Sequence, residues 1–140
     1  MNHWTRNYLI SIATIIVLQS CSVERLLDFN CEECYIDKPL YSAIQANFTI
    51  NDENQEIPLT IYRGSPDNNK IVLTDIVTAE TLFIDIENEV EYTFVARYTR
   101  NGRTHYVINT LKTQVYIDQE SCSAPCYYVT NKKVNLKIKY

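Results

Sequence analysis

Five cysteines give this sequence its most distinctive chemistry. Cys31 and Cys34 form a Cys-x2-Cys pair, Cys122 and Cys126 form a Cys-x3-Cys pair, and 87 residues separate the two pairs. Such pairs serve three chemistries: a four-thiolate zinc site, a dithiol redox centre, or structural disulfides. The fifth cysteine, Cys21, follows an apolar N-terminal run and needs a separate explanation.

The sequence around the two pairs favours structural disulfides. A redox Cys-x2-Cys pair needs positive charge nearby to lower a thiol pKa, whereas the residues inside the first pair are Glu32 and Glu33. A zinc site with four thiolates competes poorly with oxidation outside the cytoplasm, and the N-terminus predicts export. We therefore expect no metal, no cofactor, and two disulfides among Cys31, Cys34, Cys122 and Cys126.

The pairing of these disulfides stays open at the level of the sequence. Four cysteines allow three connectivities, and nothing in the sequence chooses among them. Cross-links between the two pairs would each close a loop of about 90 residues and contribute roughly 4–5 kcal/mol in the chain-entropy model. Bridges within each pair would constrain the unfolded chain far less. We favour the long-range pairing, which would join the segment before the first expected strand to the segment before the last.

The N-terminus has the pattern of a secretory signal. Residues 1–7 carry one arginine and no acid, and residues 8–18 are almost entirely apolar. A helix that crosses a bilayer needs about 20 apolar residues, so this run is too short to form a permanent transmembrane helix. The pattern predicts an exported protein.

The end of the apolar run carries a family resemblance. The tetrad L-Q-S-C, which ends at Cys21, resembles the lipobox of bacterial lipoproteins, although Gln19 occupies a place that more often holds a small residue. The resemblance implies that Cys21 becomes the first residue of the mature protein and is acylated, with chains such as palmitate. The alternative is a plain secretory signal cut near Ser20, which would leave Cys21 as an odd thiol beside four cysteines that can pair.

Composition and charge bound the partners of the mature chain. Removing residues 1–20 removes one of the 13 basic residues and none of the 17 acidic ones, so the formal charge becomes −5. This charge repels phosphate backbones, which makes nucleic acid a poor partner. We expect a signal peptide at 1–20, a tether at 21–40 and one domain at 41–140. The expected location is the outer membrane of a cell envelope, where the lipid anchor would hold the protein.

Residues 41–140 have the pattern of short β-strands. β-branched and aromatic residues dominate, apolar residues recur with a period near two, and turn residues interrupt them at short intervals. Seven strands without a convincing helix predict an all-β fold, a seven-stranded antiparallel Greek-key β-sandwich preceded by the signal-peptide helix. The expected strands are Ala43–Ile50, Ile57–Arg63, Lys70–Val77, Thr81–Ile86, Val90–Arg100, Arg103–Tyr116 and Lys133–Tyr140.

The sharpest local signal is Asn101-Gly102, which supplies the two positive φ angles of a type I′ turn. A two-residue turn at this point fixes the register of a β-hairpin. An asparagine opposite a core phenylalanine fits badly, so we expect a β-bulge at Asn109, opposite Phe94. The expected cross-strand pairs include Tyr98 with His105, Phe94 with Asn109 and Arg97 with Tyr106.

Two segments resemble known sandwich families. The segment IENEVEYTFVARY places Ile86 six residues before Tyr92, which resembles the tyrosine corner of fibronectin type III domains. The segment FTINDENQEIPLTIYRG resembles the first hairpin of transthyretin-like modules such as carboxypeptidase regulatory domains. Both resemblances imply a seven-stranded Greek-key sandwich, and the choice between the two topologies stays open.

No combination of residues predicts catalysis. His105 is the one histidine of the mature chain, and its place near a hairpin tip is typical of a surface residue. No serine lies in a G-x-S-x-G or S-x-x-K motif. The loops NDENQE and PDNN are rich in oxygen ligands for calcium, but turn chemistry explains them without a metal. We expect no catalytic residue, and the alternative is a metal-dependent or hydrolytic enzyme that uses clustered carboxylates.

Tyrosine is over-represented, with 11 in the sequence. Tyrosine supplies rigid binding area at low entropic cost, which favours a binding surface as well as a packed sheet. The leading expectation is a non-catalytic binding or accessory module for a protein or glycan partner. A further alternative is a structural protein whose edge strands assemble copies of the chain. The expected binding residues are Arg97, Tyr106, Tyr127 and Tyr128.

Overall fold

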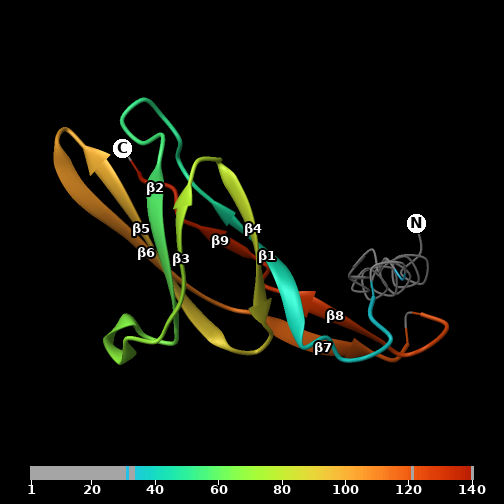
Figure 1. Cartoon of the computed structure of the whole chain (residues 1–140). Coiled ribbons are helices and arrows are strands. Elements are labelled where there is room, and N and C mark those ends of the chain that lie inside the picture. Colours follow the sequence, from blue (N-terminus) through green and yellow to red (C-terminus); the bar gives the residue numbers. More distant parts are fainter. Residues whose placement is uncertain (1–30, 32–33, 121, 140) are drawn as a thin grey trace, which may run out of the picture.

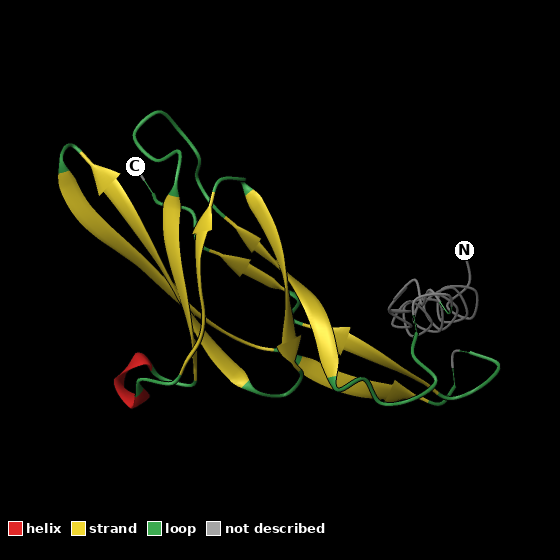
Figure 2. Cartoon of the chain, in the orientation of Figure 1, coloured by secondary structure: helices red, strands yellow, loops and turns green. Residues whose placement is uncertain are grey.

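The computed structural model describes residue 31 and the ranges 34–120 and 122–139 (Figure 1). These residues form an all-β protein with one short 3-10 turn and, in the described part of the chain, no α-helix (Figure 2). The all-β prediction is therefore confirmed. The expected signal-peptide helix, the lipobox and Cys21 lie outside the described residues. The elements are β1 (Tyr41–Asn47), β2 (Ile57–Arg63), η1 (Pro66–Asn68), β3 (Ile71–Val77), β4 (Thr81–Glu87), β5 (Glu91–Arg100), β6 (Arg103–Lys112), β7 (Gln114–Asp118), β8 (Cys126–Thr130) and β9 (Lys133–Asn135).

Two larger sheets enclose one core, and a small third sheet lies toward the N-terminal end of the described chain (Figure 1). The larger sheets have the orders β4-β1-β9 and β3-β2-β5-β6, and β7 pairs with β8. The strand pairs are antiparallel except β1–β9, which is parallel. Buried side chains alternate with more exposed ones along β1 and β2, as the period of two requires. The completely buried apolar side chains of the core include Ile44, Phe48, Ile57, Leu59, Phe94 and Leu136.

Some strand boundaries differ from the prediction. The expected strand Arg103–Tyr116 is two strands, because the chain turns away from the four-stranded sheet at Thr113, which is fully buried. The second of these, β7, pairs with β8, a strand that the sequence did not predict. The expected C-terminal strand is also shorter, since β9 ends at Asn135. Beyond it, Leu136 stays buried, and its N–H donates to the backbone oxygen of Asn47 at 2.8 Å.

The β5–β6 hairpin has the register that Asn101-Gly102 predicts. The φ angle is 51° at Asn101 and 69° at Gly102, as a type I′ turn requires. The expected bulge at Asn109 is wrong, because Phe94 and Asn109 pair without a break in the ladder. β6 is an edge strand, so Asn109 is exposed, and its amide donates to the backbone oxygen of Asn135 at 3.1 Å. This hydrogen bond links the edges of the two larger sheets.

A buried asparagine holds the polar loop between β1 and β2. Asn54 is 4% exposed, and its Nδ2 donates to the backbone oxygen of Thr99 at 2.9 Å. Its Oδ1 accepts the backbone N–H of Thr99 at 2.7 Å, so the side-chain amide pairs with β5 much as a strand backbone would. Within the loop, Asn51 Oδ1 accepts the backbone N–H of Asn54 at 2.9 Å. The oxygen-rich sequence of this loop thus has a structural use.

Replacing Asn54 by alanine is expected to lower the free energy of unfolding by about 1–3 kcal/mol, because it leaves two backbone groups of Thr99 unpaired. Urea unfolding followed by circular dichroism measures the effect. The matched control is Gln55→Ala, since Gln55 is the exposed neighbour in the same loop, and its change is expected to stay within about 0.5 kcal/mol. Equal losses in both variants would contradict the role of the amide.

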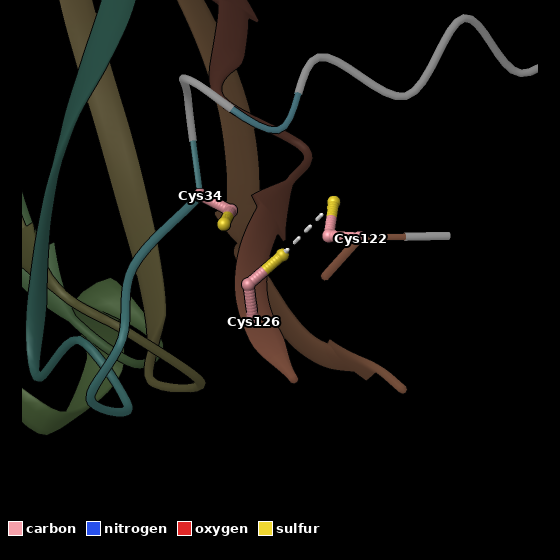
Figure 3. Close-up of side chains that lie close together, drawn as sticks. All are labelled: Cys34, Cys122 and Cys126. Carbon is pink, nitrogen blue, oxygen red and sulfur yellow. Dashed lines mark hydrogen bonds between the residues drawn. The ribbon is translucent and has the colours of Figure 1, made fainter. Parts of the chain in front are cut away.

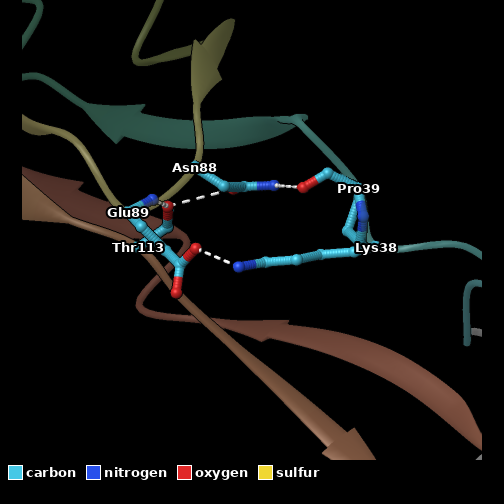
Figure 4. Close-up of polar contacts among 5 residues, drawn as sticks. All are labelled: Lys38, Pro39, Asn88, Glu89 and Thr113. Carbon is cyan, nitrogen blue, oxygen red and sulfur yellow. Dashed lines mark hydrogen bonds and ion pairs between the residues drawn. The ribbon is translucent and has the colours of Figure 1, made fainter.

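A polar network holds the end of the tether against the domain (Figure 4). The buried side chain of Asn88 donates from Nδ2 to the backbone oxygen of Pro39 at 2.8 Å. Thr113 donates its hydroxyl to Asn88 Oδ1 at 3.0 Å and accepts the N–H of Glu89 at 3.1 Å. Lys38 Nζ pairs with Glu89 Oε2 at 2.5 Å on the surface above them. The network therefore joins three places: the tether, the β4–β5 turn and the β6–β7 break.

Candidate functional site

The two cysteine pairs meet in space. Cys31 and Cys122 form a disulfide across a sequence separation of 91 residues, with their Cα atoms 5.9 Å apart. This bond has the long-range pairing that the sequence analysis favours. Cys34 and Cys126 are free thiols in the structure, so the second expected disulfide is not formed.

The two free thiols lie beside the disulfide. The sulfur atoms of Cys34, Cys122 and Cys126 all lie within 4.8 Å of one another (Figure 3). Cys126 Sγ is 3.8 Å from Cys122 Sγ. Cys126 is 2% exposed, whereas Cys34 is partly exposed. The four cysteines therefore form one cluster, in which one pair is bonded and one pair is not.

Backbone pairing brings the tether to this cluster. Tyr35 and Tyr127 form an antiparallel bridge in which each N–H donates to the other's oxygen, at 2.9 and 2.8 Å. Tyr35 follows Cys34 directly, and Tyr127 follows Cys126, so in the antiparallel bridge the two cysteines are diagonal neighbours, one on each side of the Tyr35–Tyr127 pair. An isolated two-stranded hairpin is only marginally stable in water. The tether and the disulfide thus support the small β7–β8 sheet.

The state of the sulfurs limits what the cluster can do. The pKa of Cys126 is raised to about 11 by a hydrogen bond with Cys34 and by burial, so Cys126 is protonated at neutral pH. Reactive redox thiols have lowered pKa values instead. Because Cys122 is bonded to Cys31, two thiols of the cluster are left to bind a metal, and a four-thiolate zinc site would require reduction of the disulfide.

A second candidate site is the outer face of the four-stranded sheet, formed by the outward side chains of β3, β2, β5 and β6. Four large apolar side chains on this face are at least half exposed: Ile71 and Ile76 at 52%, Tyr106 at 62% and Ile108 at 60%. Threonines fill much of the remaining face. They are Thr60, Thr74, Thr99, Thr104 and Thr110.

Charge is sparse on the outer face. Within the described strands, Arg97 is the charged residue in the middle of the outer face. Arg97 lies directly opposite Tyr106. Glu91 and Lys112 face each other at one end of the same sheet. Large apolar side chains that are exposed together on one face with little charge are typical of interaction sites in soluble domains.

Comparison with known proteins identifies no relative of this chain. No family model, curated protein or solved structure matches this chain.

The structure brings together two of the four expected binding residues. Arg97 and Tyr106 are cross-strand neighbours on the outer face. Tyr127 and Tyr128 lie on β8 in the separate small sheet, and as consecutive strand residues they point to opposite sides of it. Tyr128 stacks on Tyr116, with the ring centroids 5.5 Å apart. The four residues therefore do not form one patch.

The exposed isoleucines of the outer face were not among the expected binding residues. The hairpin register predicts Ile108 opposite Val95, two positions from the Arg97–Tyr106 pair, and the structure confirms this position. Ile71 and Ile76 could not be found this way, because their position depends on β3 pairing with β2, which no local signal specifies.

Two hollows in the described part of the chain are lined by acidic residues or by His105. A groove of about 260 Å³ lies between edge strands β3 and β4, and its described lining is apolar apart from Tyr41, Tyr92, Asp85 and Glu87. Glu87 is already paired with Arg63 at 2.7 Å. His105 is exposed at the tip of the β5–β6 hairpin and lines an open hollow with Arg100, Asn101 and Arg103.

Among the described residues, no helix is long and apolar enough to cross a bilayer.

Proposed function

We propose that this chain is a cell-envelope lipoprotein, anchored through Cys21, whose domain is a non-catalytic binding module for a protein or glycan. The outer face of the β3-β2-β5-β6 sheet is its binding surface. The observation that supports this surface most strongly is the exposure of Ile71, Ile76, Tyr106 and Ile108 on one face that carries little charge. Arg97, beside Tyr106, would supply the polar contact that fixes the orientation of a partner.

The strand order supports an immunoglobulin-like assignment within the all-β class. In such sandwiches strands B and E share one sheet, and strands C, F and G share the other. Here β1 and β4 occupy the places of B and E, and β2, β5 and β6 occupy those of C, F and G. β3 lies beside β2, as an additional strand lies beside C in the variable type. β9 takes the place of strand A beside β1, in a parallel direction.

A long-range disulfide supports export. Structural disulfides form and persist in oxidising compartments such as the bacterial periplasm or the cell surface. With Cys31 and Cys122 bonded, the two remaining cysteines of the domain are an even pair, and Cys21 is the odd one. An odd cysteine at the end of a secretory signal is what lipid anchoring uses, as the lipobox resemblance implies.

Replacing Cys21 by alanine is expected to release the protein from membranes. Attachment by acyl chains contributes about 0.8 kcal/mol per buried methylene, and this contribution is lost without the acylated sulfur. Cell fractionation measures the distribution, and mass spectrometry of the N-terminal peptide reports the acyl chains directly. A matched control is Ser22→Ala, which is expected to stay in the membrane fraction. Membrane retention of the Cys21→Ala protein would refute the anchor.

Photocrosslinking tests the binding surface. A benzophenone amino acid placed at Tyr106 in cells that express the full chain is expected to give a defined adduct. The same probe at Phe83 is the control, since Phe83 is 69% exposed but lies on β4 in the other sheet. The Ile76→Lys and Ile108→Lys variants are expected to reduce the Tyr106 adduct at least about tenfold by placing charge in the apolar contact. Equal adducts at both probe positions, or no effect of the two lysines, would contradict the assignment.

A further inference from the structure

The arrangement of Cys34 and Cys126 suits them to react with each other. They are diagonal neighbours across the antiparallel Tyr35–Tyr127 bridge. Their sulfur atoms lie within 4.8 Å of each other (Figure 3). A disulfide needs sulfur atoms about 2.05 Å apart, so rotation of these side chains must bring the two closer. The backbone bridge keeps the two segments in place for that rotation.

The two thiols differ in access. Cys34 is partly exposed, and its Sγ donates to the backbone oxygen of Cys31 at 3.4 Å. Cys126 is 2% exposed, and its sulfur lies within 4.8 Å of the sulfurs of Cys34 and Cys122. A reagent in solution therefore reaches the sulfur of Cys34 before that of Cys126.

We propose that Cys34 and Cys126 are a thiol-exchange site, at which Cys34 attacks an external disulfide and Cys126 then resolves the mixed disulfide. The product is a second disulfide between the tether and β8. This inference does not depend on the lipid anchor or on the partner of the outer face, because it concerns only atoms of the cysteine cluster.

The chemistry balances with a disulfide as the oxidant, such as a disulfide-bearing oxidoreductase of the envelope. The thiolate of Cys34 bonds to one sulfur of the oxidant, and the other sulfur of the oxidant leaves as a thiolate. The thiolate of Cys126 then bonds to Cys34 Sγ and releases the first sulfur of the oxidant as a second thiolate. The protein loses two protons and two electrons, and the oxidant gains them as a dithiol.

A competing reaction is available to Cys126, since its sulfur is 3.8 Å from Cys122 Sγ. Attack there would release Cys31 and leave a short-range Cys122–Cys126 bond. The raised pKa of Cys126 opposes this exchange, because the thiolate is the attacking form. The main cause of that raised pKa is the hydrogen bond with Cys34, which is lost once Cys34 carries the oxidant. Loss of this hydrogen bond lowers the pKa of Cys126 at the stage when Cys34 is the sulfur to attack, although burial continues to raise it.

Trapping thiols in intact cells with N-ethylmaleimide, followed by non-reducing peptide mapping, tests the product. The full-length protein is expected to contain a Cys34–Cys126 link beside the Cys31–Cys122 link. A Cys122–Cys126 link, or Cys34 and Cys126 both recovered as trapped thiols, would overturn the proposal. So would retained zinc that must be chelated before the four cysteines react.

Single-cysteine variants test the order of attack with oxidised glutathione as the probe. The Cys126→Ala protein is expected to accumulate glutathione on Cys34, because no resolving thiol is present. The Cys34→Ala protein is expected to acquire glutathione on Cys126 at least about tenfold more slowly. Cys126→Ser serves as a second variant if alanine disturbs folding, and circular dichroism checks both. Equal rates on the two cysteines would overturn the assigned order.

Discussion

In a protein whose Cys34 and Cys126 are replaced by alanine, so that no second disulfide can form, replacing Cys31 and Cys122 together by serine is expected to lower the free energy of unfolding by about 2–5 kcal/mol. The bond joins residues 91 apart in sequence, so its loss frees a long loop in the unfolded chain. It also removes the covalent support of the β7–β8 sheet, which has two strands of five residues each. Denaturant unfolding measures the change, and hydrogen exchange in β7 and β8 is expected to increase more than exchange in β5.

A reductant provides the control for this prediction. Reduction of the protein that keeps Cys31 and Cys122 but carries alanine at 34 and 126 is expected to reproduce the loss, whereas the double serine variant in the same background has no disulfide to reduce and is expected to lose nothing further. The single variant Ser123→Ala controls for substitution in the same exposed loop. A double serine variant as stable as the protein that carries only the alanines at 34 and 126 would contradict the role of the Cys31–Cys122 bond.

Phe94→Ala is expected to cost about 3–5 kcal/mol, because it leaves a cavity in the centre of the core. Phe94 is completely buried on β5, where it lies between Ile61 of β2 and Asn109 of β6. Neighbouring strands are fixed by hydrogen bonds on both sides, so the sheet relaxes little around the missing ring. Thermal and urea unfolding measure the loss.

Phe83 offers a matched comparison for this cavity. It is the same residue type on a strand of the other sheet, but it is 69% exposed. Phe83→Ala is therefore expected to change the free energy of unfolding by less than about 0.5 kcal/mol. A similar loss in both variants would mean that burial in the core does not explain the cost at Phe94.

Local signals predicted the parts of the fold that depend on near neighbours. Asn101-Gly102 fixed ten cross-strand pairs, because a two-residue turn determines the register and the side-chain period of two does the rest. The apolar positions of β1, β2 and β5 were visible from the same period.

Features that depend on distant partners were not predictable in this way. Asn109 is tolerated opposite Phe94 because β6 is an edge strand and Asn135 of β9 accepts its hydrogen bond. Thr113 interrupts what reads as one strand, because its hydroxyl is held in the network of Asn88 and Glu89. No sequence pattern around Asn109 or Thr113 predicts these hydrogen-bond partners.

The candidate sites also contain features that local sequence signals predict and features that depend on distant partners. The spacing of the cysteines was enough to favour a long-range bond, since loop length decides the entropic gain, but not enough to choose Cys31–Cys122. Arg97 and Tyr106 were paired correctly through the hairpin register. Tyr127 and Tyr128 were grouped with Arg97 and Tyr106 by residue type alone. They lie on β8 in the separate small sheet, and strand alternation points them to opposite sides of it.

The Cys31–Cys122 bond also determines how mechanical force would enter the domain. A pull applied through an anchor at Cys21 would travel along the chain to Cys31, where the covalent link diverts it into the segment before β8. The load would then be shared between that segment and the polar junction at Pro39, Asn88 and Thr113. β1, whose pairing with β4 and β9 lines the core, would be shielded from direct traction.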